Sequence, residues 1–431
     1  MRIAITTLGC KVNQYDTAVM ERLFGEKGWT QVDFREHADA YVVNSCTVTD
    51  RADSEARRLA RRARRTNADA RVIMTGCYAQ TSPTEIAELD YVDYIIGLGR
   101  LPELLGAVAG EMNERIAISD LRKATEVGAL GISSFSGRTR AFVKVQEGCN
   151  LFCTFCIVPV ARGRSRSVSP RLVLEELERL VAKGFREVVL TGIHLGGYGD
   201  DLDPAIDLAG LLECIVERDL PLRIRVSSVD PPELTERFVK IVSESGHFCP
   251  HFHIPLQAGV DTVLERMRRK YNTKEAGEAL DRLRNAFPNT AIGTDVITGF
   301  PGETEEEFER GIEWIDAQNF AYLHVFPYSQ RQSTAAAKRW TPLADSLVHD
   351  RARRMRELDG QLRRRYRTRF LGERASVLVE NSRDPKSTLL RGHTEHYVPV
   401  EFEGPDGLMN QVVDVVLGND PGKERLAARL L

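Results

Sequence analysis

Short apolar runs alternate with amphipathic stretches over the first 100 residues of the chain. The apolar runs have the length and the branched side chains of buried strands, and they lie at 3–7, 40–44, 71–75 and 91–96. The stretch at 15–27 has the spacing of an amphipathic helix. This alternation predicts a small parallel α/β sheet with covering helices.

The same alternation returns after residue 140 and is repeated six times. The six apolar runs lie at 141–145, 187–190, 223–226, 251–255, 291–297 and 320–326. Helical patterns lie between them, notably at 170–183, 234–245 and 303–318. Such repeats predict a partial or complete TIM-like (βα) barrel, with an active site at the carboxyl ends of its strands.

The segment after residue 368 has a third pattern, in which alternating runs are separated by Gly, Pro and Asn. These runs, at 375–380, 394–402 and 411–417, predict a small antiparallel β-barrel. The expected fold is therefore α/β with a C-terminal β-barrel. Its expected parts are a sheet domain at 1–110, a linker at 111–134, the (βα) barrel at 135–368 and the β-barrel at 369–431.

Composition and charge narrow the class of protein. Hydrophobic residues make up 42% of the 431 and charged residues 28%, as in a globular protein of several domains. The chain begins without a secretory signal and has no apolar window long enough for a membrane span, which predicts a cytoplasmic location. Arginines concentrate at 57–65 and 351–370, where they form either solvated helix faces or a phosphate-binding surface.

Three of the eight cysteines, Cys10, Cys46 and Cys77, each follow an apolar run of the first domain within three residues. Because the carboxyl ends of parallel strands share one edge of a sheet, three loops would bring their thiols together. Any one of these cysteines is more often a small buried hydrophobe than a ligand. The repeated placement on three successive units favours a shared metal site.

The other cysteine motif is local. Cys149, Cys153 and Cys156 form C-x3-C-x2-C directly after the first strand of the predicted barrel. Three thiolates can hold a 4Fe-4S cluster and leave one iron without a protein ligand. A structural zinc site would need a fourth ligand, and the closest candidates in sequence are the distant His194, Cys214 and Cys249, which disfavours zinc.

This spacing at the mouth of a βα barrel resembles that of radical S-adenosylmethionine enzymes. Together with the first triad, the motifs TLGCKVNQYD, NSCTVTDRA, TGCYAQ, GCNLFCTFCIVPVARGRSRS and TGFPGET are similar to those of the methylthiotransferases, over essentially the whole chain. In that family an unactivated C–H bond is replaced by C–S–CH3, with S-adenosyl-L-methionine as both methyl donor and radical source. The C-terminal barrel is similar to the RNA-binding TRAM module.

The resemblance assigns roles to individual residues. Cys10, Cys46 and Cys77 would bind an auxiliary 4Fe-4S cluster, and the catalytic Cys149, Cys153 and Cys156 would bind the cluster that cleaves S-adenosylmethionine. Cofactor contacts are implied for Phe155, Gly192 and Gln257, which barrel packing and turn geometry would explain equally well.

The substrate implied by the resemblance is N6-threonylcarbamoyladenosine at position 37 of tRNA. Arg162, Arg164 and Arg166 alternate, so an extended backbone would place them on one face, where arginine forks suit a carboxylate or phosphates. A solvated loop would explain the same pattern. Alternative substrates are N6-isopentenyladenosine in tRNA and an aspartate of a ribosomal protein. A non-enzymatic iron-sulfur RNA-binding protein is an alternative of another class.

The expected partners follow from this reaction. They are tRNA, an electron donor and a sulfur donor, with no membrane and with the chain as a monomer. The segment RQST at 331–334 departs from the family pattern, which has Pro and Gly there.

Overall fold

The computed structural model describes residues 1–127, 139–418 and 424–431. They form two compact units. The first contains the described residues before 128, together with 144–168 and 329–338, and the second contains 139–143, 169–328 and the rest of the described chain. The junction of the predicted linker (111–134) with the predicted barrel domain falls on 128–138, outside the described residues. No helix of the described chain is long and apolar enough to cross a membrane.

The first unit is built on a six-stranded sheet in the order β2-β1-β3-β4-β5-β6, all parallel. Its strands are β1 (Arg2–Thr7), β2 (Thr30–Val32), β3 (Ala40–Ser45), β4 (Arg71–Gly76), β5 (Tyr94–Ile96) and β6 (Ile116–Ala117). Its longer helices are α1 (Lys11–Glu26) and α2 (Asp50–Thr66), and α3 (Cys77–Thr81), α4 (Pro83–Ala87) and α5 (Leu104–Ala109) are short. The predicted parallel α/β sheet is confirmed. Strand β6 lies within the segment expected to be a linker.

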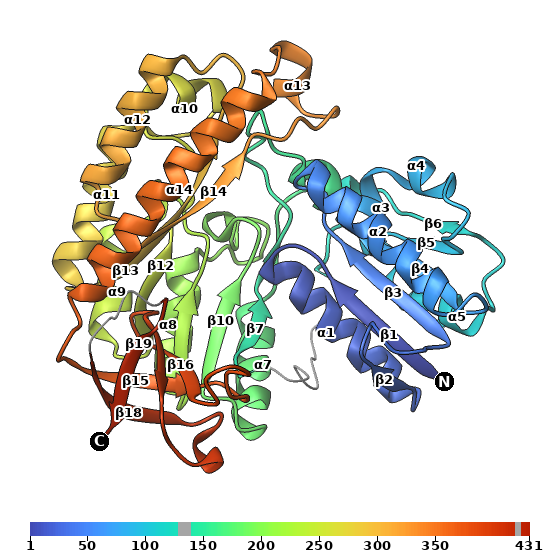
Figure 1. Ribbon diagram of the computed structural model, residues 1–431, viewed down its shortest axis with the longest axis horizontal. Helices are drawn as coiled ribbons and strands as arrows, with labels where there is room; N and C mark the ends of the chain where they lie inside the picture. The colour runs from blue at the N-terminus through green and yellow to red at the C-terminus, as the bar shows by residue number, and fades with distance from the viewer. Residues whose placement is uncertain (128–138, 419–423) are drawn as a thin grey trace. The chain divides into compact units, whose positions relative to one another are not determined.

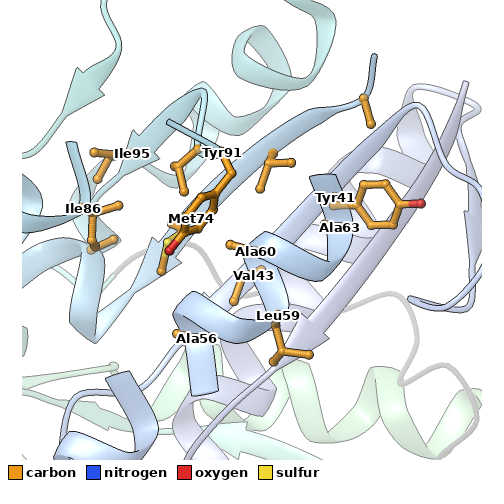
Figure 2. Packing of buried hydrophobic residues seen from close by; sticks show 14 of the residues in the cluster. Tyr41, Val43, Ala56, Leu59, Ala60, Ala63, Met74, Ile86, Tyr91 and Ile95 are labelled. Carbon is orange, nitrogen blue, oxygen red and sulfur yellow. The ribbon is translucent and has the colours of Figure 1, made fainter. Parts of the chain in front are cut away.

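Helix α2 shows how the arginine-rich sequence 57–65 can fold onto a sheet. Thr49 caps its first turn by accepting from the backbone N–H of Ala52. Small apolar residues recur on one face of the helix and pack on Tyr41 and Val43 of β3 and Met74 of β4, as Figure 2 shows. These helix residues are Ala56, Leu59, Ala60 and Ala63. The arginines occupy the other faces, so the apolar stripe and the basic run belong to one amphipathic helix.

The second unit contains a six-stranded sheet in the order β14-β13-β12-β11-β10-β7 (Figure 1). Its strands are β7 (Ala141–Lys144), β10 (Glu187–Thr191), β11 (Arg223–Val226), β12 (Phe248–His253), β13 (Ala291–Thr298) and β14 (Tyr322–Pro327). The longer helices are α7 (Pro170–Ala182), α8 (Leu208–Arg218), α9 (Glu236–Glu244), α10 (Asp261–Met267), α11 (Thr273–Ala286), α12 (Glu305–Ala317) and α14 (Asp345–Thr368). The sheet is not closed among the described residues, which makes it the partial (βα) barrel that the sequence predicts.

Strand β12 begins three residues earlier than the apolar pattern suggests. Pro250 lies inside it, and proline in a central strand removes a ladder hydrogen bond. The pairing of β11 with β12 shifts register between Ile224 and Val226, opposite this proline. A local irregularity of the ladder therefore accommodates the residue that obscured the strand in the sequence.

The C-terminal strands close into a five-stranded barrel in the order β15-β16-β17-β19-β18, which confirms the predicted β-barrel. Its neighbouring strands pair antiparallel as predicted, except that β17 and β19 are parallel. These strands are β15 (Arg374–Val379), β16 (Leu390–Thr394), β17 (Pro399–Phe402), β18 (Val412–Leu417) and β19 (Leu426–Leu430). The apolar run at 394–402 is the end of β16, a tight turn and β17, and β19 was not predicted.

A buried ion cluster joins this barrel to the amino-terminal ends of the sheet strands in the same unit. Glu187 is inaccessible to solvent, and its carboxylate accepts hydrogen bonds from Arg140, Arg223 and Arg225. The Arg225 guanidinium also donates to the backbone oxygen of Thr394, at 2.8 Å. The carboxyl-terminal ends of the strands lie at the opposite end of the sheet.

Many arginines of the two runs at 57–65 and 351–370 form ion pairs with carboxylates. In 351–370, the arginines that contact a carboxylate of a described residue include Arg351, Arg353, Arg354, Arg363 and Arg365. In 57–65, three of the six do so, namely Arg57, Arg58 and Arg64. Solvated and packed helix faces therefore account for much of both runs.

Candidate metal centres

The first cysteine triad lies at the carboxyl ends of three neighbouring strands. Strands β1, β3 and β4 are adjacent and parallel. Cys46 and Cys77 follow β3 and β4 directly, and Cys10 lies three residues after β1. The amide oxygen of Asn13 lies 3.9 Å from the Sγ atoms of both Cys10 and Cys77. A Cβ atom added at Gly9 would lie 2.9 Å from the Sγ atom of Cys46. The structure thus brings together the three thiols that the sequence placed on successive units, and their binding of a metal stays a prediction.

Burial controls the ionisation of the Cys46 and Cys77 thiols. Desolvation raises the pKa of the Cys77 thiol to about 12, and the nearby Arg162 guanidinium opposes this rise. Desolvation also raises the pKa of Cys46. Metal binding would therefore have to displace protons from both thiols, since only thiolates are ligands.

The second triad occupies one loop of the same unit. Cys149 and Cys153 are buried, and Cys156 is partly exposed. The loop is closed by the N–H of Cys149, which donates to the backbone oxygen of Gly163 at 3.1 Å, and by the N–H of Cys156, which donates to that of Cys153 at 3.0 Å. The short strands β8 (Gln146–Glu147) and β9 (Arg166–Ser167) pair at its base.

Three of the six cysteines in the triads follow a glycine in the left-handed region of φ. These glycines are Gly9, Gly76 and Gly148, with φ of 98°, 91° and 72°. A Cβ atom at Gly76 would lie 2.3 Å from the backbone oxygen of Ser45, and one at Gly148 would lie 1.9 Å from that of Arg164. The Gly-Cys dipeptides therefore allow sharp turns in which backbone packs directly on backbone.

A single metal ion sets a limit on the spacing of its ligand atoms. A single zinc ion with bonds of about 2.3 Å to sulfur needs thiols within about 4.6 Å of one another. In the part of the chain that the structure describes, two groups bring three potential ligand atoms within 4.8 Å, and neither includes a cysteine. They are His253 with Asp295 and His324, and His194 with Asp230 and Glu233. Among the described residues, neither triad therefore has its three Sγ atoms at the spacing of a single ion, and which metal each triad holds stays a prediction.

The three alternating arginines do not share one face, so that expectation was wrong. Helix α6 (Val158–Arg162) includes the first of them, and the backbone there is not extended. Arg162 and Arg166 are buried, and Arg166 donates to the backbone oxygens of Leu121 and Arg162. Arg164 alone of the three is exposed.

The residues predicted to contact the cofactor lie in both units. Phe155 is partly exposed in the loop of the second triad. In the second unit, Gly192 directly follows β10 and Gln257 lies beyond β12, next to β13. The backbone N–H of Gln257 donates to the backbone oxygen of Asp295 at 2.8 Å, which holds its φ at 78°. The contacts of these residues with a cofactor stay predictions.

An acidic and basic cluster near Gly192 was not predicted. The His194 imidazole lies 2.6 Å from the Glu233 carboxylate, and Arg269 lies 2.6 Å from Asp230. Burial lowers the pKa of His194, but the hydrogen bond and charge of Glu233 outweigh it and raise the pKa above its ordinary value. The motifs TGIHLGG and SSVDPPE both follow strands, which was the available signal.

Arg331 was also missed, although it lies in the segment that departs from the family pattern. Its guanidinium donates to the Thr47 hydroxyl at 2.8 Å, to Asp50 and to the buried carboxylate of Asp53. Thr47 directly follows Cys46. This segment, 329–338, therefore supports the loop of one cysteine of the first triad.

Comparisons with known proteins find two matching families. The family described as "Radical SAM superfamily" matches residues 143–315, and "Uncharacterized protein family UPF0004" matches residues 2–97. The threonylcarbamoyladenosine tRNA methylthiotransferase MtaB of Bacillus subtilis is 40% identical over 96% of this chain and 93% of the relative. That of Aquifex aeolicus is 37% identical over 94% and 97%.

Relatives with another printed substrate are similar over the same length. The tRNA-2-methylthio-N(6)-dimethylallyladenosine synthase of Clostridium novyi is 33% identical over 96% of this chain and 93% of the relative. Among solved structures, the radical S-adenosylmethionine methyltransferase TsrM of Kitasatospora setae matches with a TM-score of 0.56. It is 17% identical, over 78% of this chain and 77% of that chain, so the likeness is one of fold.

Proposed function

The chain belongs to the threonylcarbamoyladenosine tRNA methylthiotransferase family of radical S-adenosylmethionine enzymes, and from that premise we propose that it converts N6-threonylcarbamoyladenosine at position 37 of tRNA to its 2-methylthio derivative. The observation that carries the proposal is the presence of both cysteine triads in a chain similar to these relatives over nearly its whole length. The reaction belongs to the transferases.

The family implies a 4Fe-4S cluster and S-adenosylmethionine. Cys149, Cys153 and Cys156 would hold that cluster through three of its irons, and Phe155, Gly192 and Gln257 would contact the cofactor. Cys10, Cys46 and Cys77 would hold a second, auxiliary cluster. When bound, these groups supply a 5′-deoxyadenosyl radical and the sulfur to be inserted.

The chain's own residues would bind and orient these groups and exclude water. Burial of Cys46, Cys77, Cys149 and Cys153 keeps solvent from the ligands. The exposed Arg164 is the arginine of its motif that can reach a phosphate or a carboxylate of the substrate. The C-terminal barrel, similar to a TRAM module, would contact tRNA. An electron donor and a sulfur donor are also required.

Quantification of tRNA nucleosides by mass spectrometry tests this function. Cells that lack the gene should lose 2-methylthio-N6-threonylcarbamoyladenosine, and the wild-type gene should restore it, whereas a Cys153→Ala variant should not. Loss of the methylthio group from N6-isopentenyladenosine or from the ribosomal aspartate instead would change the substrate. Absence of any methylthio loss would leave the non-enzymatic RNA-binding alternative.

A further inference from the structure

Four buried charged residues of the first unit form a closed ring between the two cysteine triads. The Lys144 ammonium lies 2.9 Å from Asp16 and 2.5 Å from Glu147. The Arg162 guanidinium lies 2.9 Å from the other oxygen of Asp16 and also contacts the other oxygen of Glu147. Cations and anions therefore alternate around the ring, and the four formal charges cancel.

The ring connects segments that are far apart in the sequence. Asp16 lies on α1, which starts directly after Cys10, whereas Glu147 comes two residues before Cys149. Arg162 ends the helix that follows the second triad. A buried charge with an absent partner is costly, so each residue of the ring holds the other segment in place.

Asn13 extends this connection to all three loops of the first triad. Its amide nitrogen donates to the backbone oxygens of Leu8 and Ser45, at 2.7 and 3.0 Å. Its amide oxygen lies near the thiols of Cys10 and Cys77 and accepts a hydrogen bond from Arg162. One side chain thus contacts the loops of Cys10, Cys46 and Cys77, and Arg162 orients it.

Arg162 is the member of the ring that also reaches the first triad itself. It is 1% exposed, and its guanidinium donates to the amide oxygen of Asn13, which itself lies 3.9 Å from the Cys77 thiol. Its positive charge also opposes the rise that burial causes in the pKa of that thiol. Hydrogen bonds and positive charge at the sulfur ligands of an iron-sulfur cluster favour its reduced state. A guanidinium in this place would act on a cluster bound there.

We propose that Arg162 and Asn13 are positioning residues that hold the loop of the second triad in register with the first, and that the positive charge of Arg162, placed beside the first triad by Asn13, raises the reduction potential of the auxiliary cluster. This inference rests on the proposed function, in that Cys10, Cys46 and Cys77 must bind a cluster. In this proposal Arg162 acts inside the protein, on the auxiliary cluster. A residue that contacts the substrate would instead face solvent.

The test is a redox titration of the auxiliary cluster, followed by electron paramagnetic resonance. The parent is the full chain with Cys149, Cys153 and Cys156 changed to Ala, reconstituted anaerobically, so that one cluster contributes to the signal. Arg162→Gln should shift the midpoint to more negative potential, because a positive charge is lost. Asp16→Asn should shift it to more positive potential, because a negative charge is lost from the same ring.

Two further variants separate charge from packing. Arg162→Lys keeps the charge and should bring the midpoint back toward the parent value. Arg122→Gln removes an arginine that pairs with an aspartate on the surface of the same unit, and it should leave the midpoint unchanged. Shifts of the same sign in Arg162→Gln and Asp16→Asn, or unchanged midpoints with a lowered melting temperature, would show that the ring only stabilises the fold.

The same titration distinguishes this inference from the proposed function. If the parent chain binds no iron, the auxiliary cluster itself is absent, and both proposals are overturned. If the parent chain binds a cluster whose midpoint potential does not change in Arg162→Gln, the proposed function stands and the positioning proposal is overturned.

Discussion

Cys10, Cys46 and Cys77 come from three strand ends that are 36 and 31 residues apart, whereas Cys149, Cys153 and Cys156 lie within eight consecutive residues. The dispersed triad exists only when β1, β3 and β4 are paired in register. The compact triad depends on a single loop that its own backbone hydrogen bonds close. The first site therefore depends on the pairing of the whole sheet, whereas the second depends on a local turn.

Removing one cysteine from each triad should have the largest effect. Cys77→Ala and Cys153→Ala should each abolish methylthiolation. Because the two sites are separate, each variant should lose the iron of the triad that is changed and keep the iron of the other. The compact triad should still cleave S-adenosylmethionine in Cys77→Ala. Iron and sulfide analysis, with an assay of 5′-deoxyadenosine, measures both effects.

The matched control is Cys214→Ala, on the partly exposed Cys214 of α8, and it should keep both clusters. Loss of both clusters from either single variant would contradict the separation of the two sites.

The glycines before the cysteines offer a way to damage each turn without removing a ligand. Gly76→Ala should lower the free energy of unfolding by about 1–3 kcal/mol, because alanine is strained at the positive φ of this position. The close contact of the new Cβ atom with the backbone of Ser45 adds to this loss. Gly148→Ala should lower the free energy of unfolding in the same way at the compact triad of Cys149, Cys153 and Cys156. We expect each variant to lose iron from its own triad first, as measured by iron content after reconstitution.

Gly28→Ala separates backbone strain from the clash. Gly28 also has a positive φ, of 68°, but a Cβ atom there would meet nothing within 4 Å. It should lower the melting temperature less than the other two variants and keep both clusters. An equal loss of iron in all three would mean that strain in general, and not the turn beside the cysteine, controls cluster binding.

The sequence predicted the strand ends well because each depends on a local signal. Apolar runs of strand length located β1, β3 and β4 within a residue or two, and the cysteines were placed from those ends. The compact triad needed no fold at all to be found. Family resemblance then supplied the reaction, which no strand pattern could.

What the sequence did not predict are partnerships over long separations. Lys144 and Glu147 stand in the strand-like segment VKVQEGC, yet nothing local indicates that Asp16 and Arg162 neutralise them. For the same reason the alternation of Arg162, Arg164 and Arg166 suggested one exposed face. In the structure, the chain turns at Gly163 and buried carboxylates bind Arg162, so the three arginines do not share a face. Both features belong to the tertiary structure.

A cavity in the sheet core should affect the dispersed triad more than the compact one. Met74 is buried on β4, and Met74→Ala should lower the free energy of unfolding by about 2–5 kcal/mol. We expect a fall in melting temperature and slower iron uptake at Cys10, Cys46 and Cys77. Ile116→Ala, at an exposed position of β6, is the control and should change neither. Equal slowing of uptake at both triads would remove the distinction between them.

Arg331 allows a finer test, because it supports the Cys46 loop through Thr47 and Asp53. Arg331→Ala leaves the Asp53 carboxylate buried without its cation, which should cost about 1–3 kcal/mol. Asp53→Asn should cost much less, because Arg331 keeps the Asp50 carboxylate and the Thr47 hydroxyl as partners. Denaturant unfolding of the two variants, compared with the wild type, measures this asymmetry.

The effect of Arg331→Ala should also depend on pH, with a sign set by Asp53. Burial raises the pKa of Asp53 above its ordinary value although Arg331 opposes the rise. Ionisation of Asp53 therefore opposes folding. The contribution of Asp53 to folding stability is complete below its ordinary pKa, and it is lost as the pH rises through the pKa of Asp53 in the folded protein. Without Arg331 the folded pKa rises further, and the variant should regain stability relative to the wild type in mildly acidic solution. If the difference between the two proteins were the same at acidic and neutral pH, Arg331 would act by packing, and the Cys46 loop would need no charge to hold it.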